Sequence, residues 1–290
     1  MTTPLSPLPV RLPDGCPTAT RERLAAALHA VRAVAAETLR HFGDPGLEVR
    51  AKADASPVSA ADIAAEGILR ASLLAAFPDD AFLGEETGAT PGTSGYEWVV
   101  DPIDGTKSFI RGVPLWATLV GCRTAGRGVV GVIAIPALGE TVWAAEGSGA
   151  WHEHGSAPPR RARVSDRPTL GGALLCTSDF TSFARRPAGL GGAAAGDAAR
   201  RALEGACGVC RTWGDGYGYL LVATGRAELM VDPLMNAWDA AAVETVVAEA
   251  GGVFSDWSGT ARIDGGDGIA SNGRVHAAAV EILRRARGGA

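Results

Sequence analysis

Apolar residues follow a helical period near the start of the chain. Between residues 20 and 41 they recur every three or four positions, and Gly43 follows the pattern, which predicts an amphipathic helix. A second helix is expected from Ser59, where Asp62 three residues later completes a capping-box pattern, to about residue 77, because Pro78 follows. Residues 1–18 contain several prolines and no such period, and we expect them to form a flexible arm.

Short apolar runs separated by glycines come next, and they predict an antiparallel sheet with strands at residues 81–84, 97–100, 117–122, 129–135 and 141–145. Residues 152–168 are polar and rich in turn residues, so they are expected to form a domain junction or a long hairpin, with His152 and His154 in solvent. We therefore place an α+β half at residues 19–151 and a second half at residues 152–290.

The second half alternates strand-like and helical patterns, which favours an α/β layer. Strands are expected at residues 173–177, 209–212, 227–231, 252–255 and 268–270, and helices near residues 191–203, 217–224, 238–250 and 274–287.

Composition narrows the class of protein. The 290 residues carry 27 basic and 32 acidic side chains, for a net charge of −5. This balance argues against nucleic acid or an anionic membrane as partner, and no apolar run reaches the roughly eighteen residues of a spanning helix. Five scattered cysteines and the lack of a secretory signal favour a cytoplasmic protein with reduced thiols. Cys207 and Cys210 have redox or zinc spacing but no second pair, so we interpret them as structural.

Three segments combine carboxylates with turn residues: Gly84-Glu85-Glu86, Asp101-Pro-Ile-Asp104-Gly-Thr-Lys107, and Asn236-Ala-Trp-Asp239. A strand delivers Asp101, Pro102 is expected to end the strand pairing, and Gly105 permits a tight turn, so Asp101 and Asp104 can converge. Converging carboxylates repel unless a cation lies between them, and oxygen ligands suit Mg²⁺. Each segment alone is also compatible with a plain turn, a helix cap or a solvated loop.

The combination of these segments is more specific than any one of them. With them, and with a loop at residues 52–62, the chain resembles the inositol monophosphatase family of metal-dependent, lithium-sensitive phosphatases over about residues 20–287. The resemblance implies an α+β or α/β fold, the layered αβαβα sandwich of the inositol monophosphatase and fructose-bisphosphatase type. It also implies a homodimer, the common state in this family.

The resemblance also implies roles for individual residues. Glu85, Asp101 and the carbonyl of Ile103 would hold one Mg²⁺. Asp101, Asp104 and Asp239 would hold a second, with a weaker third ion near Glu85. Glu86, Thr106 and Asp62 would orient the attacking water, and the N–H groups of Gly105 and Thr106 would bind phosphate. Water acidified by Mg²⁺ would then attack phosphorus in line, with no phospho-enzyme.

The substrate is suggested by residues 106–116, which look like the histidinol-phosphate phosphatase branch of the family. Asp215 and Asp232 would suit an amine and an imidazole, and Arg111 and Trp116 could line the same mouth. The only lysines, Lys52 and Lys107, could face phosphate or substrate. We therefore expect hydrolysis of histidinol phosphate, a small phosphate monoester, in histidine biosynthesis.

Several alternatives stay open. Inositol 1-phosphate and 3′-phosphoadenosine 5′-phosphate are substrates of other branches, and fructose 1,6-bisphosphate is a substrate of some relatives. A catalytically silent metal- or phosphate-binding protein on the same fold is a further alternative. A haloacid-dehalogenase-type phosphatase is disfavoured, because its two aspartates lie two residues apart whereas Asp101 and Asp104 lie three apart.

Overall fold

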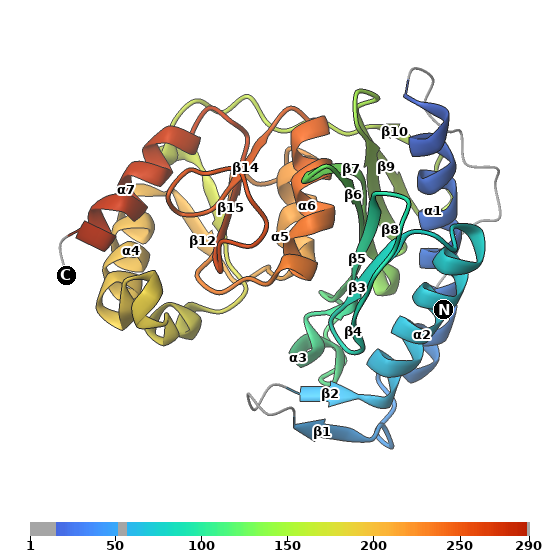
Figure 1. Cartoon of the computed structure of the whole chain (residues 1–290). Helices are drawn as coiled ribbons and strands as arrows, with labels where there is room; N and C mark the ends of the chain where they lie inside the picture. The colour runs from blue at the N-terminus through green and yellow to red at the C-terminus, as the bar shows by residue number, and fades with distance from the viewer. Residues whose placement is uncertain (1–15, 52–56, 289–290) are drawn as a thin grey trace.

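A computed structural model describes residues 16–51 and 57–288. Lys52 and most of the expected N-terminal arm lie outside these residues. Figure 1 shows five layers, in which α1 and α2 cover an eight-stranded sheet, α5 and α6 separate it from a five-stranded sheet, and α4 and α7 cover the far side. The predicted αβαβα sandwich is therefore confirmed.

The two N-terminal helices form where the apolar period predicts them, as α1 (Thr18–His41) and α2 (Ala60–Ala76). Ser59 and Asp62 make the expected capping box at the start of α2. The apolar face of α1 is completely buried at Leu24 and Val34 and packs on the sheet with α2. A short hairpin of β1 (Val49–Ala51) and β2 (Pro57–Ser59) precedes α2.

The first sheet has the order β10-β9-β8-β7-β6-β5-β3-β4 and is antiparallel except between β3 and β5. Its strands are β3 (Ala81–Gly84), β4 (Gly88–Thr90), β5 (Tyr96–Asp104), β6 (Ala117–Thr124), β7 (Arg127–Ile135), β8 (Glu140–Ala145), β9 (Ala150–His154) and β10 (Arg160–Arg161). The one-turn helix α3 (Thr106–Phe109) follows β5, and η1 (Pro136–Leu138) joins β7 to β8.

Two local expectations are wrong. Pro102 does not end β5, because a register shift between Asp101 and Asp104 absorbs it and Asp104 pairs with Ala117. His152 is not in solvent: it lies on β9, is 4% exposed, and its Nε2 is 2.6 Å from Glu140 Oε1. The polar pattern of residues 152–168 concealed this strand, since buried polar residues satisfied by each other look like loop residues. The division at residue 151 stays a prediction, and β9 spans it.

The second sheet has the order β12-β11-β13-β15-β14, with β11 parallel to β12 and to β13. After β10 the chain forms, in order, η2 (Leu170–Gly172), β11 (Leu174–Cys176), η3 (Phe180–Arg185), η4 (Ala188–Leu190), α4 (Gly192–Ala206), β12 (Val209–Arg211), α5 (Gly216–Ala223), β13 (Leu229–Asp232), α6 (Ala237–Glu249), β14 (Val253–Ser255), β15 (Gly268–Ser271) and α7 (His276–Gly288). Burial raises the pKa of the Cys207 thiol to about 12, which disfavours the reactive thiolate form.

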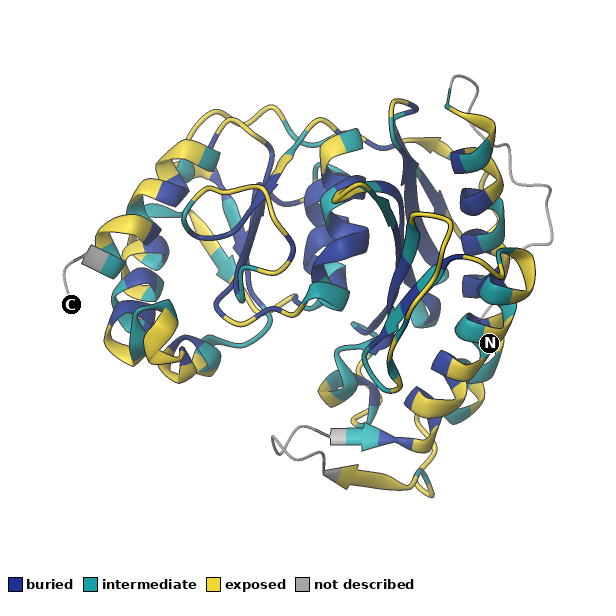
Figure 2. Cartoon of the chain, viewed as in Figure 1, coloured by how far each residue is buried: buried dark blue, intermediate teal, exposed yellow. Residues whose placement is uncertain are grey.

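Helix α6 packs unusually close to the first sheet because glycines face it. A Cβ on Gly121 would lie 2.8 Å from Ala241, and one on Gly131 would lie 2.3 Å from the carbonyl oxygen of Ala242. Figure 2 shows α6 and the neighbouring strands as the most continuously buried part of the molecule. This close packing fixes the N-terminus of α6, which carries Asp239, relative to the strands of the sheet.

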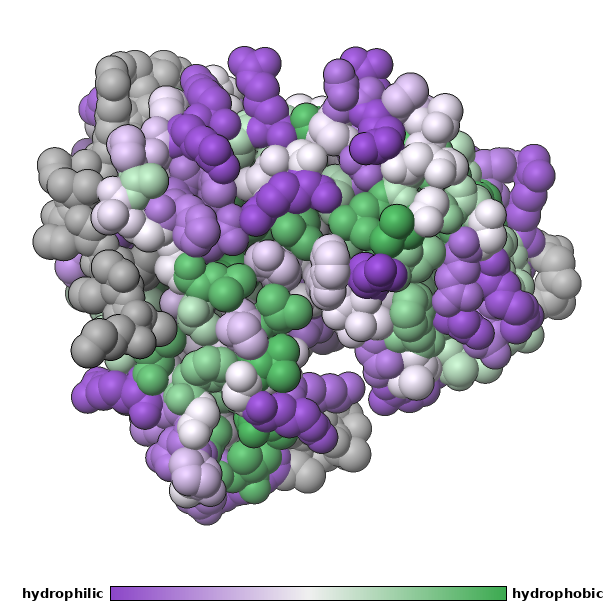
Figure 3. All heavy atoms as spheres, turned by 180° about the vertical axis from the view of Figure 1, so that it is seen from behind, coloured by the Kyte–Doolittle hydropathy of each residue, from purple (hydrophilic) through white to green (hydrophobic). Residues whose placement is uncertain are grey.

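The opposite face of the molecule has hydrophobic groups among hydrophilic side chains, and a notch interrupts its lower edge (Figure 3). Large hydrophobic residues that are at least two-fifths exposed include Ile63, Trp213 and Leu234. The expected homodimer stays a prediction. Within the described part of the chain, no helix combines the length and the apolar character needed to cross a membrane.

Candidate active site

The end of β5 turns two carboxylates towards the same point. Asp101 is 2% exposed, and its Oδ1 accepts a hydrogen bond of 2.9 Å from the N–H of Ile103. The irregularity at Pro102 changes the alternation of the strand, so Asp104 faces the same side. Gly105 follows with a φ of +87°, and a Cβ there would lie 2.6 Å from Asp215 Oδ2. Only glycine fits this turn without strain.

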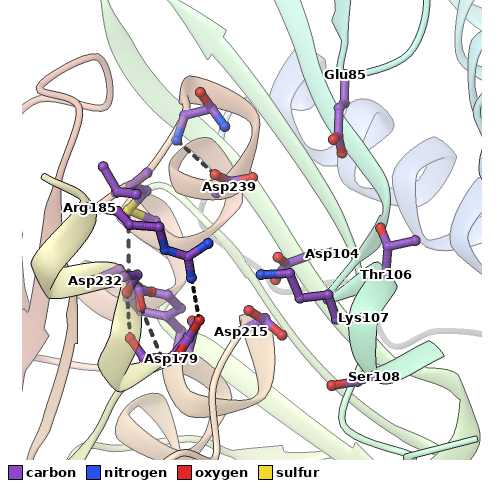
Figure 4. A pocket seen from close by; sticks show the side chains of 17 residues that line it. Glu85, Asp104, Thr106, Lys107, Ser108, Asp179, Arg185, Asp215, Asp232 and Asp239 are labelled. Carbon is purple, nitrogen blue, oxygen red and sulfur yellow. Dashed lines mark hydrogen bonds and ion pairs between the residues drawn. The ribbon is translucent and has the colours of Figure 1, made fainter. Parts of the chain in front are cut away.

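Asp239 joins these two carboxylates from the start of α6. Its Oδ2 accepts a hydrogen bond of 2.7 Å from the N–H of Asn236, which holds the side chain in a capping box. One carboxylate oxygen each of Asp101, Asp104 and Asp239 lies within 4.8 Å of the others, and Figure 4 shows Asp104 and Asp239 bordering one cavity.

The three carboxylates strongly disfavour their own ionisation. Burial, with the charges of Glu85, Asp104 and Asp239, raises the pKa of Asp101 well above its usual range. Burial and neighbouring carboxylates raise the pKa of Asp104 in the same way and bring that of Asp239 to about 7. A divalent cation would reverse these shifts, because it replaces the repulsion by attraction. Oxygen donors alone, brought this close, fit a hard cation such as Mg²⁺.

Glu85 and Glu86 are placed by a residue that sequence reasoning missed. Glu66, on α2, is fully buried and accepts hydrogen bonds from the N–H groups of Glu86 (2.7 Å) and Thr87 (2.8 Å). A Cβ on Gly84 would lie 2.4 Å from the Glu66 carboxyl group. The available signal was the spacing, since Glu66 lies four residues after Asp62 on the same face of α2. Glu85 lines the cavity, and its charge helps to raise the pKa of Asp62, Asp101 and Asp239.

Thr106 and Asp62 are brought together although 44 residues separate them. The Thr106 Oγ1 atom lies 3.3 Å from Asp62 Oδ1 and 3.2 Å from the carbonyl oxygen of Ile103. Asp62 Oδ2 accepts hydrogen bonds from Ser59, at 2.8 Å from its N–H and 2.5 Å from its Oγ. The Thr106 hydroxyl is therefore held between two oxygen acceptors, at the rim of the carboxylate cluster.

The cavity beside these groups has a volume of about 370 Å³. Gly105, Thr106, Lys107, Asp215 and Asp232 all line it, and the Lys107 side chain points towards Asp104 (Figure 4).

Asp232 forms the floor of this cavity. It is 6% exposed and accepts hydrogen bonds from Tyr219 Oη (2.8 Å) and from the N–H of Ser178 (3.1 Å). Burial raises its pKa to about 6 although these hydrogen bonds oppose the shift. Burial also raises the pKa of Asp215.

Two expected substrate residues lie elsewhere. Arg111 is exposed, its Nη1 donates to the carbonyl oxygen of Lys107 at 3.2 Å, and it does not line the cavity. Trp116 is fully buried, with its ring 5.0 Å from that of Phe109 and 5.8 Å from that of Phe42. Trp116 therefore belongs to the core beneath α3, because the chain after Gly112 turns back to begin β6. Lys52 lies outside the described residues.

The far wall of the cavity was also missed by sequence reasoning. It comes from Ser178, Asp179, Ser182 and Arg185, on and just before η3, and from residues 234–236. The segment around η3 carries no motif, and the capping pattern at Asn236 gave no sign that residues 234–236 line a cavity. Only tertiary packing brings both segments to it.

Comparison with known proteins decides the family. A model of the inositol monophosphatase family matches residues 20–287. The chain belongs to the inositol monophosphatase family. Members of this family are metal-dependent phosphatases that generally use Mg²⁺, so the chain is a phosphatase, and the haloacid-dehalogenase alternative is excluded.

Several relatives are similar over most of their length. The histidinol-phosphatase of Mycobacterium tuberculosis is 39% identical over 86% of this chain and 91% of its own. That of Streptomyces coelicolor is 39% identical over 83% and 89%. The inositol-1-monophosphatase of Mesorhizobium japonicum is 34% identical over 85% and 87%.

Solved structures of the family superimpose well on this one. The extragenic suppressor protein SuhB of Bartonella henselae has a TM-score of 0.80 at 30% identity, covering 90% of this chain and 98% of its own. The IMPase of Thermotoga maritima has a TM-score of 0.78 at 27% identity, covering 92% and 99%. The identities to histidinol-phosphatases therefore exceed those to the other relatives named here.

Proposed function

We propose that this protein hydrolyses histidinol phosphate to histidinol and phosphate, a step of histidine biosynthesis. One observation carries the proposal: the cavity that borders the carboxylate cluster has further carboxylates, Asp215 and Asp232, on its wall and floor. These groups suit a leaving alcohol that bears an amine and an imidazole. The similarity to histidinol-phosphatases supports the same substrate.

The carboxylate cluster would hold the metal. We assign Glu85, Asp101, Asp104, Asp239 and the carbonyl of Ile103 as ligands of two to three Mg²⁺ ions. Bound Mg²⁺ would acidify water and neutralise the charge that develops on the phosphate oxygens. The protein's part is to hold these oxygens in place, which the Asn236 cap, the Ile103 N–H and the buried Glu66 do.

The remaining residues would orient water and phosphate. The Thr106 hydroxyl, fixed between Ile103 and Asp62, can accept a hydrogen bond from water and pass its own proton towards Asp62. Glu86 would assist in orienting this water. The N–H groups of Gly105 and Thr106, at the first turn of α3, have no intrahelical partner and would donate to phosphate oxygens. The reaction would be a direct attack of water on phosphorus.

The cavity wall would bind the leaving group. Lys107 lines the cavity next to Thr106 and would pair with a phosphate oxygen. Asp232, ionised above a pH of about 6, would accept the substrate ammonium together with Asp215.

Phosphate release tests this proposal. The substrates are L-histidinol phosphate, inositol 1-phosphate, 3′-phosphoadenosine 5′-phosphate and fructose 1,6-bisphosphate, each with Mg²⁺ and with EDTA. We expect a large kcat/KM preference for histidinol phosphate that EDTA abolishes. Preference for another ester would overturn the substrate, and Mg²⁺-dependent binding without release would support a silent binding protein.

We also propose that the protein acts as a homodimer in the cytoplasm, as the family resemblance and the composition suggest. Sedimentation velocity at micromolar concentration should give twice the chain mass of 29.6 kDa. A monomer at every concentration would contradict the assembly without affecting the proposed chemistry.

A further inference from the structure

The cavity wall opposite α3 contains an ion pair that neither the family resemblance nor the proposed reaction uses. Arg185 Nη2 lies 2.6 Å from Asp179 Oδ2, and Figure 4 shows the pair facing the same space as Lys107. Asp179 also caps η3, since its Oδ1 accepts a hydrogen bond of 2.8 Å from the N–H of Thr181. The backbone therefore fixes this carboxylate at the edge of the cavity.

Asp179 is linked directly to the floor of the cavity. It follows Ser178, whose N–H donates to Asp232 Oδ1 at 3.1 Å. Asp232 is nearly inaccessible, whereas the Asp179 side chain is 34% exposed. The two carboxylates thus lie at different depths of one cavity. Each can receive one of the two nitrogen-bearing groups of a ligand that extends from the floor to the edge.

The charge on Asp179 persists at neutral pH. Partial burial favours its neutral form, but the hydrogen bonds from Thr181 and the charges of Arg185 and Lys107 outweigh this, and its pKa is lowered. The Arg185 side chain is 55% exposed. Arg185 can therefore leave the pair for solvent at little cost, because an exposed ion pair contributes little free energy.

We propose that Asp179 is a specificity-determining residue: its carboxylate accepts a hydrogen bond from the distal, nitrogen-bearing end of the phosphate ester, in exchange for Arg185. This inference rests on the proposed function, because it assigns the imidazole of histidinol phosphate to Asp179 and its amine to Asp232 and Asp215. The alternative, in which Arg185 binds an anionic substrate group, is disfavoured because Asp179 already neutralises Arg185 and the nearby wall is acidic.

Two substitutions test this proposal because they break the same ion pair with opposite expected effects. Asp179→Asn removes the carboxylate charge but keeps an oxygen that caps η3. Arg185→Gln frees the carboxylate. The measurement is kcat/KM for histidinol phosphate relative to glycerol 2-phosphate, whose leaving alcohol is uncharged.

We expect Asp179→Asn to lower this ratio about tenfold, mainly through the KM for histidinol phosphate, the size of one charge-assisted hydrogen bond at a partly exposed site. Arg185→Gln should raise the ratio about twofold, and Asp179→Glu should restore part of the loss. The matched control is Asp264→Asn, which breaks another exposed pair (Arg262 Nε to Asp264 Oδ1, 2.7 Å) outside the cavity, and it should leave the ratio unchanged.

Equal losses in Asp179→Asn and Arg185→Gln would overturn the proposal, because they would show that only the intact ion pair matters. A ratio that neither variant changes would overturn it as well. A loss of fructose 1,6-bisphosphate hydrolysis confined to Arg185→Gln would assign the wall to anionic substrates instead. If the wild type releases no phosphate from histidinol phosphate, the proposed function fails together with this inference, whereas the other outcomes affect Asp179 alone.

Discussion

Asp239→Asn should stabilise the metal-free protein while removing its activity. Burial raises the pKa of Asp239 from 3.8 to about 7 in the folded state. The folded chain therefore holds this proton more tightly than the unfolded chain. Asp239 therefore lowers the free energy of unfolding progressively as the pH rises from about 4 to 7, and this decrease stays constant above pH 7. Asparagine is neutral throughout and can still accept the N–H of Asn236, so it avoids this loss.

The size of the effect follows from the shift. About three pKa units at about 1.4 kcal/mol each set an upper limit of about 4 kcal/mol. Solvent reaches part of this side chain, and the N-terminus of α6 favours a negative charge, so we expect about 2 kcal/mol at pH 8. For a chain of 290 residues that corresponds to a rise in Tm of about 3 °C.

Thermal unfolding in EDTA at pH 4, 6 and 8 measures this effect. The gain of Asp239→Asn over wild type should be near zero at pH 4 and largest at pH 8. Adding Mg²⁺ should raise the wild-type Tm and change that of the variant much less, and phosphatase activity of the variant should fall at least about a hundredfold, as for loss of a group that holds a catalytic metal.

The matched control is a buried aspartate whose charge is compensated. Asp80 is 2% exposed and pairs with Arg23 through two contacts of 2.7 and 2.9 Å. Asp80→Asn should lower stability in the same buffer by about 3 kcal/mol, because it leaves a buried guanidinium without its counter-charge. If Asp239→Asn is destabilised like Asp80→Asn at pH 8, the carboxylates at the site do not repel one another and the reasoning is wrong.

Three further predictions concern the residues around the site. Glu66→Gln should raise the Mg²⁺ concentration needed for half-maximal activity about tenfold, because it loosens the turn that carries Glu85. An unchanged Mg²⁺ titration would show that other contacts hold this turn. Gly131→Val should lower the free energy of unfolding by about 3 kcal/mol, because the added side chain pushes α6 away from the sheet. Gly171→Ala, whose added Cβ has nothing within 4 Å, should have no such effect. Equal Tm values for the two variants would contradict the close packing. Tyr219→Phe removes a hydrogen bond to ionised Asp232 and should raise the pKa of Asp232 above about 6. The acid limb of the pH profile of kcat/KM for histidinol phosphate should then move to higher pH. If this limb does not move, Asp232 does not bind the substrate ammonium.

The sequence carried information about the site wherever the chemistry is local. Asp101, Asp104 and Gly105 lie within five residues at the end of β5, so local chain geometry brings them together. The capping patterns at Ser59 and Asn236 have the same local origin. Helical period likewise predicted α1 and α2, because one face of each must be buried. Strand β9 escaped notice because its buried polar residue His152 is paired with Glu140 of the neighbouring strand β8.

Only the tertiary structure decided which distant residues meet. Asp239 reaches Asp101 because glycines on β6 and β7 let α6 approach, and no local pattern encodes that distance. Glu66 supports the Glu85 turn across 20 residues, and the Asp179–Arg185 pair faces Lys107 across the cavity. Trp116 sits in the core instead of the cavity for the same reason. Short-range geometry fixes which groups can act together within a segment, whereas the packing of helices on sheets fixes which segments share a site.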